Sequence, residues 1–176
     1  MKTTQYVREL ADREAIRECL FRYSRAIDRR DRPLLDSVFW PDAVTDYGFF
    51  AGPVREMVDW AFEALATMDQ TMHSMTNMLI DIELPVAKVE TYYVAYHRRT
   101  GPDGLAVDQT LGGRYLDRME KRDDDWRIAD RHMVIDWMTE NPASGDWAMR
   151  LPGVAFRTNM IPDDPSCRFF AGTRLG

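Results

Sequence analysis

IRECLFRYSRAIDRRDRPLLDSVFWPDAVTDY, residues 16–47, is the stretch that decides the fold. Its apolar residues recur every three or four positions, which is typical of the buried face of an α-helix. They are Ile16, Leu20, Tyr23 and Ile27. Asp28 lies about 140° round this helix from Tyr23, at 100° per residue. Both side chains therefore reach one cavity only if the helix runs along the cavity wall or ends there.

Helical periodicity and proline breaks predict three helices before residue 70. They are expected at residues 5–30, from Pro33 to Phe39 with Trp40-Pro41 as the stop, and at residues 54–69. A first strand is expected at Val44–Tyr47, followed by a turn from Gly48 to Pro53. The apolar period then falls to two, which predicts long strands separated by turn residues. These strands are residues 72–83, 86–99, 106–121 and 126–139.

This order of elements predicts an α+β fold in which a strongly curved, mostly antiparallel sheet wraps round the helices. Residues 1–140 are expected to form a single domain with a cone-shaped cavity. Residues 141–176 contain several prolines but keep large apolar side chains, which are rare in disordered tails. These are Trp147, Leu151, Phe156, Phe169 and Phe170. We expect this extension to pack over the cavity mouth or on a neighbouring subunit.

Composition limits the class of partner. The chain of 176 residues is 45% hydrophobic and has a formal net charge of −6, which argues against nucleic acid or an anionic membrane as the main partner. Cys19 and Cys167 have no metal-binding spacing, so a reducing compartment is expected. The N-terminus lacks a hydrophobic signal segment and no apolar run has membrane length. The sequence predicts a soluble, cytoplasmic protein.

A set of residues in a particular order resembles a known superfamily. The set comprises Tyr23, Asp28, Leu34–Trp40, Pro41-Asp42-Ala43, His73 with Thr76-Asn77, and Arg131 five residues after Trp126. Over residues 6–140 the chain is similar to the SnoaL-like, NTF2-like superfamily, in the branch of scytalone dehydratase, bile acid 7α-dehydratase and lindane dehydrochlorinase. The resemblance implies an NTF2-like cone with three N-terminal helices, and cofactor-free lyase chemistry on a small hydrophobic or aromatic substrate.

His73 and Asp28 are the predicted catalytic pair. A His beside a buried carboxylate is a general base whose tautomer is fixed and whose protonated form is stabilised. Taken alone, a core His and an Asp bound to backbone amides would be the simpler interpretation of these two residues. Their order relative to Tyr23 and Arg131 favours the catalytic one.

Tyr23 and Arg131 are the other predicted catalytic residues. Tyr23 supplies a phenolic donor for a substrate oxygen or a leaving hydroxide, although plain core packing is the alternative. Bile acid dehydratase resembles this chain in having Tyr there, whereas the dehydrochlorinase has Lys, which favours loss of an oxygen group over chloride. Arg131 would stabilise an enolate or a departing anion if its strand face lines the cavity. It matches the dehydrochlorinase; bile acid dehydratase has its Arg four positions later, where this chain has Ile135.

Five further residues are predicted to contact substrate. They are Asn77, His97, Trp40, Met75 and Phe50. Scytalone dehydratase uses a second His from its sheet, and His97 is the candidate for that position, with an ordinary core or surface His as the alternative. Methionines and aromatic residues near His73 suit a bulky aromatic or polycyclic ligand, and suit an ordinary core equally well.

The preferred hypothesis is a dehydratase-type lyase that needs no cofactor and no metal, since no metal-ligand spacing is found. Within the same superfamily, the alternatives are a ketosteroid-isomerase-like isomerase, a polyketide cyclase and a formaldehyde-releasing lyase acting on lignin-derived aromatics. The alternative of another class is a non-catalytic ligand-binding protein or a structural subunit like the dioxygenase β chain. A homo-oligomer, dimer or trimer, is expected because the helices cannot cover every apolar face of the sheet.

Overall fold

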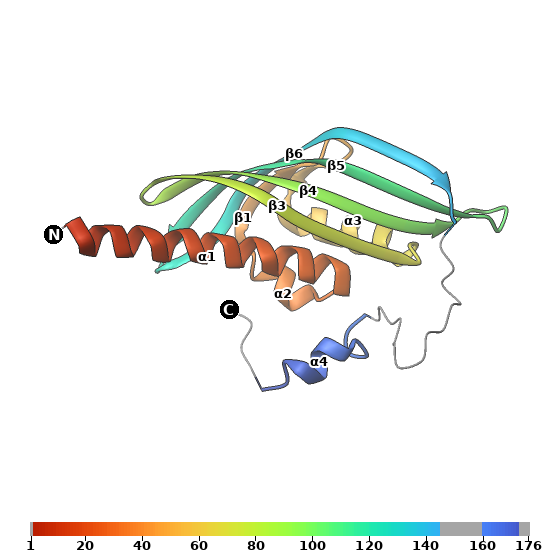
Figure 1. The fold of residues 1–176 in the computed structure, drawn as a ribbon, viewed down its shortest axis with the longest axis horizontal. Helices are drawn as coiled ribbons and strands as arrows, with labels where there is room; N and C mark the ends of the chain where they lie inside the picture. Colours follow the sequence, from red (N-terminus) through yellow and green to blue (C-terminus); the bar gives the residue numbers. More distant parts are fainter. Residues whose placement is uncertain (1, 145–159, 173–176) are drawn as a thin grey trace.

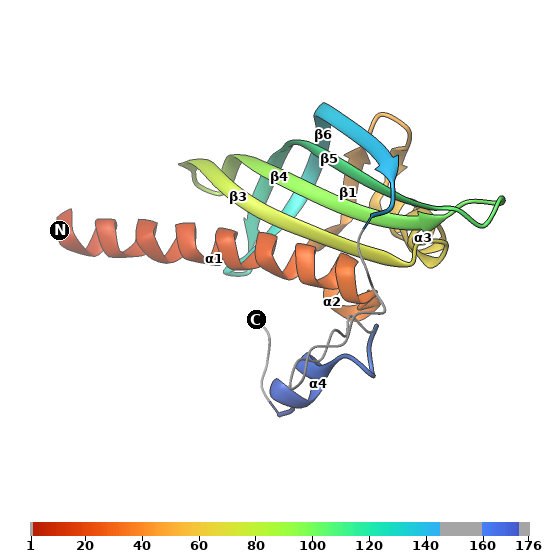
Figure 2. The same ribbon diagram turned by 45° about the vertical axis from the view of Figure 1, so that its right-hand side comes forward.

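The computed structural model describes residues 2–144 and 160–172, and shows helices packed against one side of a curved sheet (Figures 1 and 2). The predictions for Trp147, Leu151 and Phe156 lie outside the described residues. The helices are α1 (Lys2–Arg29), α2 (Arg32–Asp36), α3 (Val54–Ala66) and α4 (Pro165–Phe169). The strands are β1 (Phe39–Asp46), β2 (Ala51–Pro53), β3 (Gln70–Glu83), β4 (Val86–Thr100), β5 (Ala106–Arg122) and β6 (Asp125–Pro142). The predicted α+β cone is confirmed.

The sheet has the strand order β2-β1-β6-β5-β4-β3. Every pair is antiparallel except β1 with β6, which run parallel. Register shifts interrupt the ladders, one of them between Gly112 and Gly113 opposite strand β6. A Cβ built on Gly113 would lie 1.9 Å from the carbonyl oxygen of Val134, so only glycine fits this close approach. Such bulges bend a strand, and the bend contributes to the curved sheet that encloses the helices.

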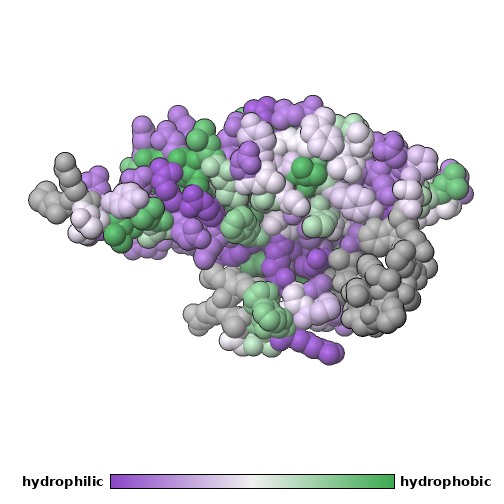
Figure 3. Space-filling model, in the orientation of Figure 1, coloured by the Kyte–Doolittle hydropathy of each residue, from purple (hydrophilic) through white to green (hydrophobic). Residues whose placement is uncertain are grey.

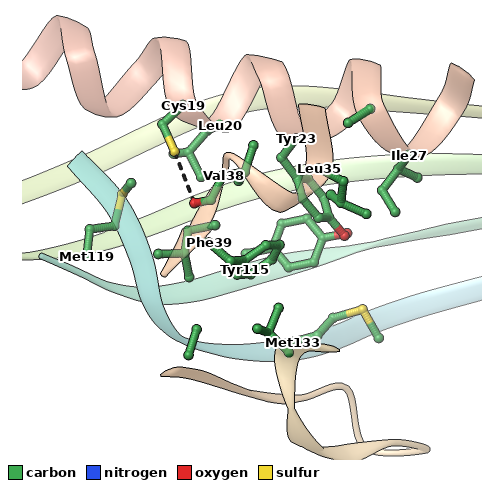
Figure 4. Packing of buried hydrophobic residues seen from close by; sticks show 14 of the residues in the cluster. Cys19, Leu20, Tyr23, Ile27, Leu35, Val38, Phe39, Tyr115, Met119 and Met133 are labelled. Carbon is green, nitrogen blue, oxygen red and sulfur yellow. Dashed lines mark hydrogen bonds between the residues drawn. The ribbon is translucent and has the colours of Figure 1, made fainter. Parts of the chain in front are cut away.

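The predicted apolar stripe of helix α1 is buried. Ile16 and Leu20 are fully buried, and Tyr23 and Ile27 are nearly so. Figure 4 shows this face of the helix over Phe39 and the sheet residues Tyr115, Met119 and Met133. The helix ends at Arg29, one residue after Asp28, so the stripe leads directly to the end of the helix. This is the arrangement that lets Tyr23 and Asp28 approach one cavity.

The boundary between helix α2 and strand β1 differs from the prediction. Asp31 caps α2 by accepting a hydrogen bond from the Leu34 N–H at 3.1 Å, and the helix ends at Asp36. Phe39 belongs to strand β1, where it pairs with Ile128 of strand β6. The predicted helix to Phe39 and the predicted strand start at Val44 are therefore wrong. Pairing with a distant strand outweighed the short helical pattern, which spans too few residues to distinguish the two.

Residues 160–172 of the C-terminal extension lie against helix α1, away from the sheet (Figure 2), whereas Asn141 and Pro142 still pair with strand β5. The Ile161 N–H donates to the Arg29 carbonyl oxygen at 3.2 Å, and the Arg25 guanidinium donates to the Ser166 hydroxyl at 2.9 Å. Phe169 is exposed. That the C-terminal extension packs over the cavity mouth or on a neighbouring subunit stays a prediction. The domain boundary at residue 140 also stays a prediction. No helix within the described ranges is both long and apolar enough to cross a membrane.

Candidate active site

A cavity of about 270 Å³ lies between helices α1 and α3 and the inner face of the sheet. Most of its lining is aliphatic or aromatic, including Met57, Leu65 and Met68. Polar groups enter it from separate elements of the described chain. The lining residues that carry them are His73, His97, Gln109, Tyr23, Tyr47, Tyr93 and Tyr115. An apolar pocket with a few converging polar groups is the usual form of a small-molecule site.

The Asp28 carboxylate holds both the ring and the main chain of His73. Its Oδ1 lies 2.7 Å from His73 Nδ1, and its Oδ2 accepts the His73 backbone N–H at 2.8 Å. The Thr71 hydroxyl donates to the same carboxylate at 3.2 Å. An ionised carboxylate only accepts, so the neutral imidazole carries its proton on Nδ1 and leaves Nε2 as the basic nitrogen. The predicted pair is therefore assembled, at the wall of the cavity.

His97 lies beside this pair on strand β4. Its ring centroid is 5.3 Å from that of His73, with the rings nearly perpendicular. Burial lowers the pKa of His97 to about 4, and the neighbouring His73 acts in the same direction. His97 is thus neutral at pH 7. Its Nδ1 is buried with no hydrogen-bond partner among the described residues.

Tyr23 and Tyr47 both line the cavity, and their hydroxyl oxygens are 3.2 Å apart. Burial raises the pKa of both phenols, so both keep their protons at neutral pH. Tyr47, which follows strand β1, was not among the predicted site residues. Its signal was the alternation of Ala43, Thr45 and Tyr47, all of which are buried on one face. Tyr23 and Tyr47 together form a pair of neutral donors.

Arg131 is completely buried and does not line the cavity. Its Nε and Nη2 each donate to the Asp117 carboxylate at 2.7 Å. Burial disfavours the charge, but the Asp117 carboxylate outweighs burial and raises the pKa of Arg131 above its ordinary value. The guanidinium carbon lies 4.1 Å from the ring centroids of Tyr23 and Tyr115, which are neighbours in Figure 4. Arg131 therefore packs against the rings of Tyr23 and Tyr115, outside the cavity lining.

Comparison with known proteins identifies the family of this chain. A family model described as the SnoaL-like domain matches residues 8–132. The chain belongs to this family. It is also 31% identical over 150 residues to terrestric acid biosynthesis cluster protein E of Penicillium crustosum, covering 80% of this chain and 90% of that relative.

Solved structures share the SnoaL-like fold at low sequence identity. One, from Novosphingobium aromaticivorans and named as a candidate scytalone dehydratase, is 24% identical, with a TM-score of 0.68 over 93% of this chain and 99% of that one. A type 2 hexachlorocyclohexane dehydrochlorinase is 20% identical, with a TM-score of 0.68 over 83% and 97% of the two chains. These similarities establish the fold and leave the reaction to be argued from the site.

Four of the residues that were predicted to contact substrate do not line the cavity. Asn77 is exposed at the irregularity between Met75 and Met78 on strand β3. The Trp40 indole N–H donates to the Glu120 carbonyl oxygen at 3.0 Å, outside the cavity. Met75 packs half-buried against the core, and Phe50 packs beside Trp60. Of the five predicted substrate contacts, only His97 lines the cavity, where Phe49 and Trp60 supply aromatic surface.

Proposed function

We propose that this SnoaL-like protein is a cofactor-independent lyase of the dehydratase type. The substrate is a hydrophobic ring compound with a carbonyl group and a β-hydroxyl group. The observation that carries the proposal is the Asp28–His73 pair, which is hydrogen-bonded through Nδ1 at the wall of an apolar cavity. That arrangement provides an oriented base in apolar surroundings, which suits removal of a carbon-bound proton.

In this proposal His73 Nε2 takes a proton from the carbon next to the carbonyl group. The Asp28 carboxylate stabilises the resulting imidazolium. The electron pair of the broken C–H bond passes into the carbonyl group as an enolate, then forms the C=C bond as the β-carbon releases hydroxide. Hydroxide becomes water by gaining a proton, which the imidazolium or a phenol supplies.

The Tyr23–Tyr47 pair is proposed to stabilise the enolate oxygen or to protonate the leaving hydroxide. Both hydroxyl groups are buried and protonated. One donates to the other, which leaves the second O–H to donate a hydrogen bond to a developing negative charge. The Arg131 cation lies behind the Tyr23 ring and opposes the effect of burial on the pKa of both phenols. Arg131 thereby makes the two tyrosines better donors, acting as a positioning residue instead of the direct oxyanion contact that its sequence position had suggested.

The size of the cavity narrows the substrate class. Ligand pockets commonly enclose about 300–1,000 Å³, and this one encloses about 270 Å³. The volume favours a compound of one or two rings over the polycyclic ligand that the methionine-rich sequence had also suggested. Two solved structures of the same fold are named as a candidate scytalone dehydratase and a hexachlorocyclohexane dehydrochlorinase, and these names support the reaction class.

The test uses 3-hydroxy-1-tetralone, a two-ring β-hydroxy ketone that loses water to give 1-naphthol. The wild-type protein is expected to accelerate both deuterium uptake at C2 in D2O, followed by NMR, and formation of 1-naphthol, followed by fluorescence. His73→Gln should lower both rates by about 10²- to 10⁴-fold, the usual contribution of a general base. His132→Gln is the matched control, because His132 is exposed and pairs with the exposed Asp46.

The two measurements, deuterium uptake and 1-naphthol formation, distinguish the proposed lyase from the alternative functions. Deuterium uptake without 1-naphthol would favour the isomerase alternative, in which the same base moves a proton and no group leaves. Tight binding of the ketone with neither reaction would favour a ligand-binding protein. Equal rates for wild type and His73→Gln would refute the proposed base.

A further inference from the structure

Tyr93 lies on strand β4 with its side chain in the cavity and its hydroxyl group without a partner. The residue is 2% exposed, and no hydrogen bond to its phenolic oxygen is formed by the described residues. Its ring stacks on Tyr115 with 4.3 Å between centroids and 19° between planes. The stacking fixes the ring, so the hydroxyl group cannot turn away to find a partner elsewhere.

An unpartnered buried hydroxyl costs a folded protein about 1–3 kcal/mol, so native structures retain few of them. The neighbouring phenols differ in this respect, since Tyr23 and Tyr47 lie within hydrogen-bond distance of each other. Burial raises the pKa of Tyr93 to about 12, so its hydroxyl keeps its proton and serves as a donor at neutral pH. The cavity lining thus contains a fixed donor that has no acceptor among the described residues.

The strand register places this donor relative to the proposed base. His73 pairs with Ala95, and Tyr93 is the next residue of strand β4 on the same face. Diagonal neighbours of this kind have backbones about 7–8 Å apart. A ring compound with its reacting carbon at His73 would therefore present a substituent of the same ring, or of a fused ring, to Tyr93.

We propose that Tyr93 is a specificity-determining residue that recognises a second oxygen on the substrate, a ring hydroxyl or carbonyl remote from the reacting carbon. The inference rests on the proposed function for the position of the reacting carbon. A substrate with that oxygen satisfies the Tyr93 hydroxyl, whereas an analogue without it leaves the hydroxyl unpartnered. Rejection of the analogue follows from this difference in the bound state.

The experiment measures binding, so that it does not depend on turnover. Isothermal titration calorimetry compares 1-tetralone with its 5-, 6- and 7-hydroxy derivatives. At least one hydroxy derivative is expected to bind wild type about tenfold more tightly than 1-tetralone, the equivalent of one good hydrogen bond. Tyr93→Phe removes only the hydroxyl group and should reduce this ratio to near one while the affinity for 1-tetralone is kept.

Tyr92→Phe is the matched control, since Tyr92 is the adjacent tyrosine of the same strand, is 43% exposed and does not line the cavity. It should keep the wild-type ratio. His73→Gln should keep the ratio as well, which separates this inference from the proposed base chemistry. The inference is overturned if wild type prefers none of the hydroxy derivatives, or if Tyr93→Phe prefers one as strongly as wild type does, as when a water alone occupies the position.

Discussion

Asp28 uses two oxygens for three donors, and these donors come from the side chains of Thr71 and His73 and from the main chain of His73. The same residue therefore orients the proposed base and anchors the start of strand β3 to the end of helix α1. The sequence predicted the pairing of Asp28 with His73 because the order of both residues resembled a family. It could not predict the backbone hydrogen bond, which depends on where the strand begins.

Asp28→Asn is expected to impair both roles. An amide has one acceptor oxygen, and its NH2 group repels the donors that the second carboxylate oxygen serves. Deuterium uptake by 3-hydroxy-1-tetralone should fall about 10²-fold or more, and the free energy of unfolding in urea should fall by about 1–3 kcal/mol. Asp46→Asn is the control, because Asp46 contacts His132 at 3.2 Å on the surface. Equal stability losses in the two variants would contradict the anchoring role.

His97 should make stability depend on pH. Burial lowers the pKa of His97 from 6.5 to about 4, so between these values the unfolded chain binds a proton that the folded chain does not. The free energy of unfolding should therefore fall as pH falls from 6.5 to 4, by up to about 1.4 kcal/mol per pH unit. Urea unfolding at pH 7, 5.5 and 4.5 should show a smaller pH dependence in His97→Gln than in wild type. An unchanged slope in that variant would count against the buried neutral His97.

The role of Asp117 was not predicted from the sequence, and the reason is physical. Asp117 is a charged residue on the buried face of strand β5, between Tyr115 and Met119. Its alternation with apolar neighbours was a usable signal for a buried ion pair, but its partner could be any buried cation. Only the register, which places Asp117 opposite Arg131, selects it. Arg131 consequently pairs with a carboxylate inside the fold.

At the scale of elements, boundaries set by turn residues were predicted more closely than boundaries set by pairing. The hairpins after Glu83 and Arg122 coincide with the predicted Pro85 and Lys121–Asp125 breaks. Strand β1 begins earlier than predicted because its partner, strand β6, lies far along the chain. A turn can be predicted from the residue types in the local sequence, whereas pairing with a distant parallel strand cannot.

Gly113→Ala should destabilise the fold more than Gly112→Ala. A Cβ at Gly113 meets the Val134 backbone oxygen at 1.9 Å, while one at Gly112 meets the Trp137 ring at 2.4 Å. The Trp137 side chain is half-exposed and can rotate away, but the Val134 main chain is held in the sheet. The expected loss for Gly113→Ala is about 1–3 kcal/mol or more, measured by urea unfolding. The bulge geometry would be refuted if the two variants lost equal stability.

At the scale of the whole molecule, apolar side chains remain exposed on two surfaces. The outer face of strands β4 to β6 carries Tyr92, Val94, Leu116 and Trp137. The N-terminal half of helix α1 and the adjacent β3–β4 hairpin form the second surface, where Figure 3 shows hydrophobic colouring. Contiguous apolar surface of this kind is typical of protein contacts. The predicted homo-oligomer stays a prediction, and these surfaces give it a test.

Multi-angle light scattering after size exclusion should give a mass that is a multiple of the chain mass. Val94→Glu places a charge on the outer face of the sheet and should lower that mass towards the monomer, because a buried unpaired charge opposes association. Leu105→Glu is the control, since Leu105 is 66% exposed in the β4–β5 loop. A monomeric wild type would refute the prediction, and an unchanged mass in Val94→Glu would exclude this face.

The double attachment of His73 to Asp28 affects how divergence within the family should be interpreted. A descendant that lost its chemistry would still benefit from an Asp at this position, because the carboxylate continues to hold the main chain of strand β3. The imidazole contributes nothing to that backbone hydrogen bond, so selection would release it first. Under the proposed function, replacement of the His among relatives is therefore the informative sign of a lost reaction, and persistence of the Asp is not evidence that the reaction survives.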